Sequence, residues 1–163
     1  MGHFKIDDEF WVFEIQTDYC GKGYHCGLTY GGPNTCIEFR VDNDTANIFD
    51  IQCIYLGDIL QEPVFQIPDI RSNPELEKLE APKCYETDDD HRLPCIVNVI
   101  RDEMQLIFSG KSFDVYYYYA DGRVEFYYDE DMNLLHIKVT DLTETEYNFL
   151  KSHGANGEYY HWI

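Results

Sequence analysis

Two groups of residues in this chain are of types that carry chemistry in proteins. The first combines thiols with an imidazole around a glycine-rich stretch, and consists of Cys20, His25, Cys26 and Cys36. Zinc prefers such ligands, and a thiol beside a histidine can also act as a nucleophile. The chain contains no Cys-x-x-Cys pair, however, and no catalytic-cysteine motif surrounds these residues. A zinc-binding or enzymatic domain centred on this group is therefore an alternative and not the main prediction.

The second group consists of acidic residues interleaved with tyrosines. Asp and Glu number 31 against 12 Lys and Arg, which gives a net charge of −19, and the chain has 14 tyrosines. Carboxylates form charge-assisted hydrogen bonds with cations, and tyrosine rings stack on guanidinium groups. We therefore expect a cationic protein as the partner. The residues predicted to bind it are Asp88, Asp89, Asp90, Tyr116, Tyr118, Glu125, Tyr127, Asp129, Glu130 and Asp131.

The same charge argues against several other classes of function. Binding to the phosphates of DNA or RNA requires a cationic surface, and so does docking on an anionic membrane. The chain has no long uncharged apolar run, and Asp7, Asp8 and Glu9 replace the basic start of a secretion signal. Aromatic residues make up 16 % of the sequence, which is typical of a folded chain. We expect a folded cytoplasmic protein without a cofactor or metal.

Strands dominate the first part of the chain. Alternation of apolar and polar residues predicts strands at residues 10–15, 36–41 and 48–56, the last two forming a hairpin. The glycine-rich residues 19–34 are expected to form a loop or short irregular strands. Residues 61–94 contain most of the prolines, which predicts a long acidic connection with one helical turn at 74–79.

Five further strands are predicted after Pro94. They lie at residues 95–100, 104–108, 113–119, 123–128 and 134–139. The short gaps between them indicate a meander of antiparallel hairpins. The dipeptide Asp121-Gly122 is typical of a two-residue hairpin turn, which would set Tyr119 opposite Val124. Alternation then gives one apolar face and one wetter face, and the wetter face carries the predicted partner-binding tyrosines and His136.

A helix at about 143–153 has the most specific structural signal in the sequence. Thr143 and Glu146 form a capping box, in which each side chain can bond the other residue's backbone amide. Leu142 and Tyr147 occupy the positions of a hydrophobic staple. Gly154 is a suitable stop for the helix.

The predicted fold class is α+β and mostly β. It is a twisted antiparallel meander sheet with the C-terminal helix and an N-terminal strand set packed on it. We expect one domain over residues 1–163, composed of an N-terminal strand part (1–60), the proline-rich connection (61–94) and the meander with its helix (95–163).

In size, acidity and lack of a catalytic motif, the chain resembles bacterial immunity proteins in its bulk properties. This resemblance implies a non-enzymatic inhibitor that neutralises a cationic, nuclease-like toxin by occupying its basic cleft. Electrostatic attraction would make the capture of such a toxin fast. Two alternatives stay open: the zinc-binding or enzymatic domain, and a soluble β domain that binds a ligand and whose acidity serves only solubility.

Overall fold

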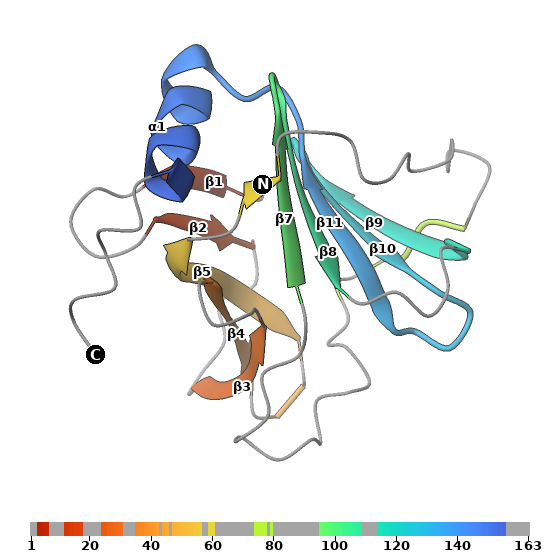
Figure 1. Ribbon diagram of the computed structural model, residues 1–163. Coiled ribbons are helices and arrows are strands. Elements are labelled where there is room, and N and C mark those ends of the chain that lie inside the picture. The colour runs from red at the N-terminus through yellow and green to blue at the C-terminus, as the bar shows by residue number, and fades with distance from the viewer. Residues whose placement is uncertain are drawn as a thin grey trace.

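The chain builds two β-sheets and a C-terminal helix. The computed structural model describes residues 3–6, 12–17, 24–30, 35–42, 44–45, 47–56, 59–60, 74–77, 79, 95–108 and 114–155. Sheet A has the strand order β1 (His3–Ile6), β2 (Phe13–Gln16), β5 (Ile48–Leu56), β4 (Thr35–Asp42) and β3 (Tyr24–Tyr30). Sheet B has the order β6 (Ile59–Leu60), β7 (Cys95–Ile100), β8 (Glu103–Phe108), β11 (Leu134–Val139), β10 (Val124–Tyr128) and β9 (Tyr117–Asp121). Helix α1 (Glu144–Ala155) follows β11 and lies next to β1 (Figure 1).

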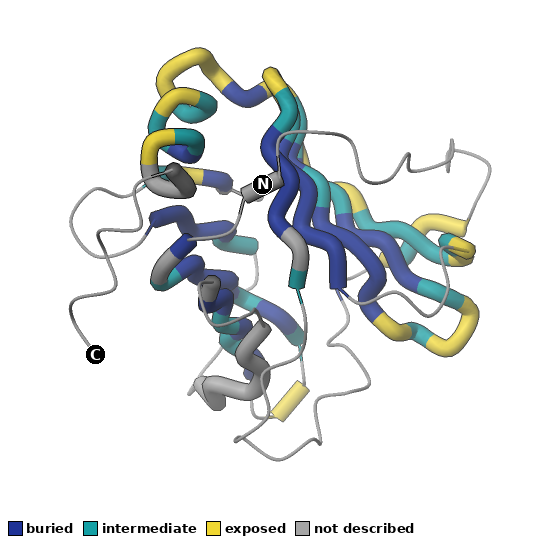
Figure 2. The backbone as a smooth tube through the Cα atoms, in the orientation of Figure 1, coloured by how far each residue is buried: buried dark blue, intermediate teal, exposed yellow. Residues whose placement is uncertain are grey.

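Apolar side chains from both sheets form one continuous core. Phe39 of β4 and Phe108 of β8 meet edge to face, with their ring centroids 5.7 Å apart. Leu150 of α1 is fully buried in the same cluster. Figure 2 shows that the buried residues follow the central strands of both sheets. Burial of apolar surface is the dominant favourable term in folding, so this core holds the sheets and the helix together. The predicted fold class, mostly β with a C-terminal helix, is confirmed.

Sheet A differs from the sequence prediction mainly at its edges. The predicted hairpin is confirmed, since β4 and β5 pair antiparallel and the Asp42 carboxylate closes their turn by accepting from the amides of Asp44 at 3.0 Å and Thr45 at 2.8 Å. Strand β1 was not predicted, and β2 begins later than residue 10. The glycine-rich segment contains β3, whose register shifts between Cys26 and Leu28. This confirms an irregular strand there, with the bulge at a glycine.

Sheet B is not a simple meander. The predicted hairpins β7–β8, β9–β10 and β10–β11 are present, but β11 inserts between β8 and β10 and leaves β9 at the edge. The expected pairing of the second and third strands of the meander is therefore wrong. Placing β11 in the centre buries its apolar residues from Leu134 to Val139 between two neighbours, whereas the tyrosine-rich β9 takes the partly exposed edge.

The turn of the β9–β10 hairpin is Gly122-Arg123, and not the predicted Asp121-Gly122. Asp121 pairs with Val124, and Gly122 has a φ of 61°. A two-residue turn with glycine at its first position and a positive φ is of type II′, which matches the twist of paired strands. Tyr119 therefore lies opposite Phe126 and not opposite Val124. The shift is by two residues, so the predicted faces are preserved.

The described part of the long connection is extended and not helical. Leu76 donates its amide to the carbonyl of Tyr118 at 2.7 Å, and Tyr118 donates to the carbonyl of Pro74 at 3.2 Å. These bonds lay residues 74–76 beside the outer edge of β9, where Glu75 forms a parallel bridge with Tyr118. The predicted helical turn is therefore wrong, because a proline at residue 74 also fits an edge segment.

Helix α1 begins as the sequence predicts. The amide of Glu146 donates to the Thr143 hydroxyl at 3.2 Å, and the amide of Thr143 donates to the Glu146 carboxylate at 3.0 Å. The capping box is confirmed. The helix runs to Ala155, so Gly154 lies within it and is not the stop. Among the residues that the structure describes, no helix has the length and apolar character needed to cross a membrane.

Candidate protein-binding surface

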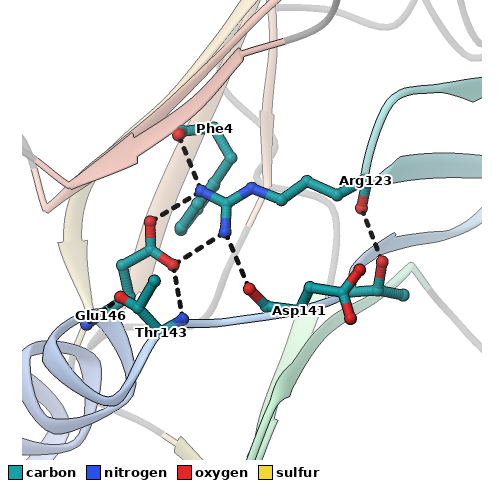
Figure 3. A network of polar contacts seen from close by, with 6 residues as sticks. Phe4, Arg123, Asp141, Thr143 and Glu146 are labelled. Carbon is teal, nitrogen blue, oxygen red and sulfur yellow. Dashed lines mark hydrogen bonds and ion pairs between the residues drawn. The ribbon is translucent and has the colours of Figure 1, made fainter.

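Arg123 anchors the hairpin that carries the predicted surface. Its guanidinium donates to both carboxylate oxygens of Glu146, at 2.7 and 2.8 Å. It also donates to the carbonyls of Asp141 at 3.2 Å and Phe4 at 3.1 Å, and it lies over the Phe4 ring (Figure 3). One side chain thus joins the β9–β10 turn, the start of α1 and strand β1 of sheet A.

This anchor is also held electrostatically. Burial alone would raise the pKa of Glu146, but its hydrogen bonds from Arg123 and Thr143 outweigh that effect and hold the pKa below its usual value. The bond to Glu146 in turn raises the pKa of Arg123. Bidentate arginine–carboxylate pairs fix orientation as well as energy. The Gly122-Arg123 end of the hairpin is therefore fixed against α1 and β1, and its opposite end lies at the β10–β11 turn.

We call that opposite end the distal surface. Its exposed or half-buried side chains come from the 74–77 segment, the residues before and within β9, and the β10–β11 turn. They are Glu75, Glu77, Asp114, Tyr116, Tyr118, Glu130 and Asp131. Figure 2 shows the exposed segments at this end of sheet B.

The two tyrosines of the distal surface differ in exposure. Tyr116 is 44 % exposed, and its ring packs edge to face on Tyr117 with centroids 4.6 Å apart. Tyr118 is half-buried, and its hydroxyl donates to the Glu75 carboxylate at 3.3 Å. A ring that is supported from one side and open on the other can stack on a guanidinium. Tyr116 therefore fits the predicted role, and Glu75 joins the surface although the sequence prediction did not include it.

Tyr127 and Glu125 do not fit the predicted role. Tyr127 is 1 % exposed, so the expectation that it lies outside the core is wrong. Its hydroxyl donates to the Glu125 carboxylate, and the Lys138 ammonium lies 3.6 Å from the same carboxylate. Burial first, and then the hydrogen bond to Glu125 and the charge of that carboxylate, raise the pKa of Tyr127. The polar groups of these three side chains therefore contact one another on the face of sheet B.

The acidic turn between β10 and β11 divides into two roles. The Asp129 carboxylate accepts from the amides of Asp131 at 2.9 Å and Asn133 at 2.8 Å, and from the Asn133 side chain at 2.9 Å. It therefore builds the turn, as Asp does in many loops. Glu130 and Asp131 are exposed at the tip. The predicted residues Asp88, Asp89 and Asp90 lie outside the described residues.

The alternative zinc group is not assembled by sheet A. Strand pairing sets His25 beside Val41 and Cys26 beside Arg40, whereas Cys36 lies near the other end of β4. Four residues of strand separate Cys36 from residue 40, roughly 13 Å at the usual rise per residue. Zinc needs its ligand atoms within about 2.3 Å of the metal. Cys36 is therefore too far along the strand to share a metal with the other two, and Cys20 lies outside the described residues.

Buried polar groups elsewhere in the sheets were missed by the sequence prediction. Glu14, Asp50 and Gln52 are buried on sheet A, and His136 is 1 % exposed on sheet B. His136 lies on the face that was predicted for it, but this face is buried there and not wet. Burial lowers the pKa of His136 to about 4. For Glu14, Asp50 and Gln52, the sequence offered one signal: polar residues spaced two apart within the otherwise apolar strands β2 and β5.

The chain was compared with known proteins. None of the protein-family models that were searched matches it, and none of the curated proteins does.

Proposed function

We propose that the protein is an acidic inhibitor that binds a cationic protein through the distal surface. The observation that carries the proposal is the charge of this surface. Within residues 74–77 and 114–133, Arg123 is the only Lys or Arg, and its charge is committed to Glu146 at the opposite end of the hairpin. Acids therefore outnumber cations in these segments, which supports binding of a cation from another molecule.

The physical basis is electrostatic complementarity. Unbalanced acids on an exposed surface attract a positively charged protein over several ångströms and accelerate the encounter. At contact, Glu130 and Asp131 supply carboxylates for Lys and Arg, and Tyr116 supplies a ring on which a guanidinium stacks. Tyrosine and arginine are enriched at the centres of protein interfaces.

The partner that suits this surface best is a nuclease-like toxin. A nuclease cleft is cationic because it holds phosphates, so a rigid acidic surface can occupy it and exclude the nucleic acid. The proposed action is blockage by binding and not catalysis. An immunity-type role of this kind would place the protein in the cytoplasm of a bacterium that makes the toxin.

The test begins with capture of the partner from the native cell, followed by an assay of its nuclease activity with and without the purified chain. Stoichiometric inhibition is expected. The association rate constant should fall about tenfold or more between low and high salt, because the encounter is steered by charge. A rate and affinity that ignore ionic strength would contradict the proposal.

Matched variants locate the surface. Glu130→Gln with Asp131→Asn should slow association more than dissociation, and Tyr116→Ala should speed dissociation. Asp102→Asn with Glu144→Gln removes the same charge from exposed residues at the α1 end of the molecule and should change neither rate. Asp88, Asp89 and Asp90 changed together to Asn test whether this acidic run of the sequence adds to the electrostatic attraction.

Two other functions are separated by the same experiments. If the acidity serves only solubility, the variants of the distal surface should bind the captured protein as well as the wild type does. A zinc-binding or enzymatic domain would contain stoichiometric zinc in the purified protein, lost when Cys20, His25 and Cys26 are changed to Ser or Ala.

A further inference from the structure

Two rows of polar residues cross the side of sheet A opposite to the shared core. The register aligns Lys5 of β1, Glu14 of β2, Gln52 of β5 and Glu38 of β4 in one row. The next row aligns His3, Gln16, Asp50 and Arg40 on the same four strands. Directly opposed residues point to the same side of a sheet. Charged and amide groups therefore replace apolar packing on this face.

The centre of this face is buried. Glu14, Asp50 and Gln52 are 6 %, 5 % and 2 % exposed. The Gln52 amide donates to Asp50 at 2.9 Å and to Glu14 at 3.4 Å, and so holds the two carboxyl groups together. These two side chains are called the carboxyl pair below. A buried pair of like charges is expensive unless one of the two groups stays neutral.

Cations flank the carboxyl pair unequally. Lys5 lies 2.6 Å from Glu14, whereas the contact of Arg40 with Asp50 is longer, at 3.5 Å. Gln16 also donates to Glu14, at 3.1 Å. Glu14 thus has the better support as an anion. Asp50 has one carboxyl oxygen, Oδ1, that is buried and without a hydrogen-bond partner, which suits a neutral carboxyl group better than an ionised one.

The pKa shifts agree with this geometry. Burial, and then the neighbouring Glu14, raises the pKa of Asp50 to about 7. Burial alone would raise the pKa of Glu14 as well, but the bonds from Lys5, Gln16 and Gln52 bring it below its usual value. Two interacting acids titrate as a unit. The last proton to leave as pH rises therefore belongs to the pair, and it is lost only near neutral pH.

We propose that Glu14 and Asp50 share one proton, and that this shared proton is a pH-sensitive lock on the edge of sheet A. While the proton is held, the carboxyl pair and Gln52 tie β2 to β5. When it leaves, two adjacent anions repel each other in a buried site, and the β1–β2 edge opens from β5 more often. Arg123 bonds the carbonyl of Phe4 in β1, so opening of this edge also disturbs the contact between the sheets.

The other charged groups on this face set the strength of the lock. Lys5 and Arg40 reduce the repulsion, and Glu38, opposite Gln52, adds to it. On the outer strands, His3 is at the register position next to Gln16, and Cys26 of β3 is at the position next to Arg40.

The direction of the effect follows from linkage. Between the ordinary pKa of Asp near 4 and the folded value of about 7, the folded protein holds a proton that the unfolded chain has released. Stability conferred by the pair is therefore present at low pH and falls as pH rises. One proton changes the unfolding constant by at most about tenfold per pH unit.

The test combines carboxyl-carbon NMR titration of Asp50 and Glu14 with unfolding and amide hydrogen exchange between pH 5 and 8. In the wild type, both carbons should respond to one titration near pH 7. The opening constant of β2 amides should rise between pH 5 and about 7, by at most about tenfold per pH unit, and level off above pH 7. Asp50→Asn mimics the neutral form and should abolish the rise. The other titrating groups are common to the wild type and the variant, so their contribution drops out when the two pH profiles are subtracted. Asp102→Asn serves as the exposed control and should leave it unchanged.

A second variant keeps the proposal falsifiable if Asp50→Asn perturbs folding. Glu14→Gln removes the anionic neighbour, so the Asp50 titration should move to lower pH while staying above 4 because of burial. The proposal is overturned if Asp50 titrates near pH 4 in the wild type, or if the midpoint is the same in Glu14→Gln. It is also overturned if β2 opening does not follow the titration.

Discussion

Acidic residues occupy two regions of this molecule under opposite conditions. On the outer face of sheet A, Glu14 and Asp50 are buried and contact Lys5 and Arg40. On the distal surface of sheet B, acids such as Glu130 and Asp131 are exposed. The one Lys or Arg of residues 74–77 and 114–133 is Arg123, which pairs with Glu146 at the other end of the hairpin. The same side-chain type therefore forms buried polar contacts in one region and is exposed to solvent in the other. Burial and the placement of cations distinguish the two regions, and charge density alone does not.

The two sheets also respond oppositely to pH. Asp50 binds a proton more tightly in the folded state, whereas burial keeps His136 of sheet B neutral and lowers its pKa to about 4. Between pH 4 and 6.5, rising pH therefore weakens the contribution of Asp50 and strengthens that of His136. In the wild type we expect these two slopes to oppose each other. Variants that remove one of the two groups should uncover the slope of the other.

The largest expected effect comes from a substitution in the apolar core that the two sheets share. Phe39 is fully buried and meets Phe108 across the sheets. Phe39→Ala should lower the free energy of unfolding by about 3 to 5 kcal/mol, because it removes buried area and leaves a cavity. Urea unfolding followed by tryptophan fluorescence and far-UV circular dichroism measures the loss. A variant as stable as the wild type would show that the two sheets do not depend on this contact.

The next effect is loss of the Arg123 anchor. Arg123→Ala should cost about 3 kcal/mol, because it removes both donors of the guanidinium to Glu146 and the bond to the Phe4 carbonyl, and leaves the Glu146 carboxylate with the Thr143 amide alone. Lys138→Ala is the control: its 3.6 Å contact with Glu125 is partly exposed and should be worth less than about 1 kcal/mol. Urea titrations of both variants give the comparison. Equal losses would mean that Arg123 does not join the two sheets energetically.

The local pattern of the sequence was enough for much of this fold. Alternation located the strands Ile48–Leu56, Cys95–Ile100 and Leu134–Val139 at their observed bounds, and the capping box located the start of α1. These elements depend on neighbours in sequence. The central place of β11 does not, because it depends on which strands bury each other's faces. The turn at Gly122 was misplaced by one residue, because the same dipeptide fits more than one turn type.

The candidate site could be predicted less fully for the same reason. Tyr116, Glu130 and Asp131 were expected at an accessible surface, and the structure places them there. Tyr127 was predicted on the same sheet face as Tyr116, yet it is buried and bonded to Glu125. The carboxyl pair was missed because its members are far apart in the chain and meet only through the pairing of β2 with β5.

A pH experiment sharpens the contrast between the sheets. In the wild type, the unfolded chain protonates its histidine below pH 6.5 while folded His136 does not, so His136 should cost about 1.5 kcal/mol of stability between pH 6.5 and 5. His136→Leu removes this loss. Stability of the variant should therefore decrease more steeply with rising pH than that of the wild type, because the Asp50 contribution is then unopposed. Thermal unfolding across this range measures both slopes, and parallel curves would contradict the assignment.

The smallest expected effect on stability is the most informative about function. Glu130→Gln with Asp131→Asn changes two exposed side chains at the tip of the β10–β11 turn, so the free energy of unfolding should stay within about 0.5 kcal/mol of the wild type. It should rise rather than fall, because the distal surface repels itself when no partner is bound. A marked loss of stability would mean that these acids are part of the fold, as Asp129 is. An unchanged or improved stability, together with slower association with the cationic partner, would separate the distal surface from the buried acids of sheet A by function as well as by position.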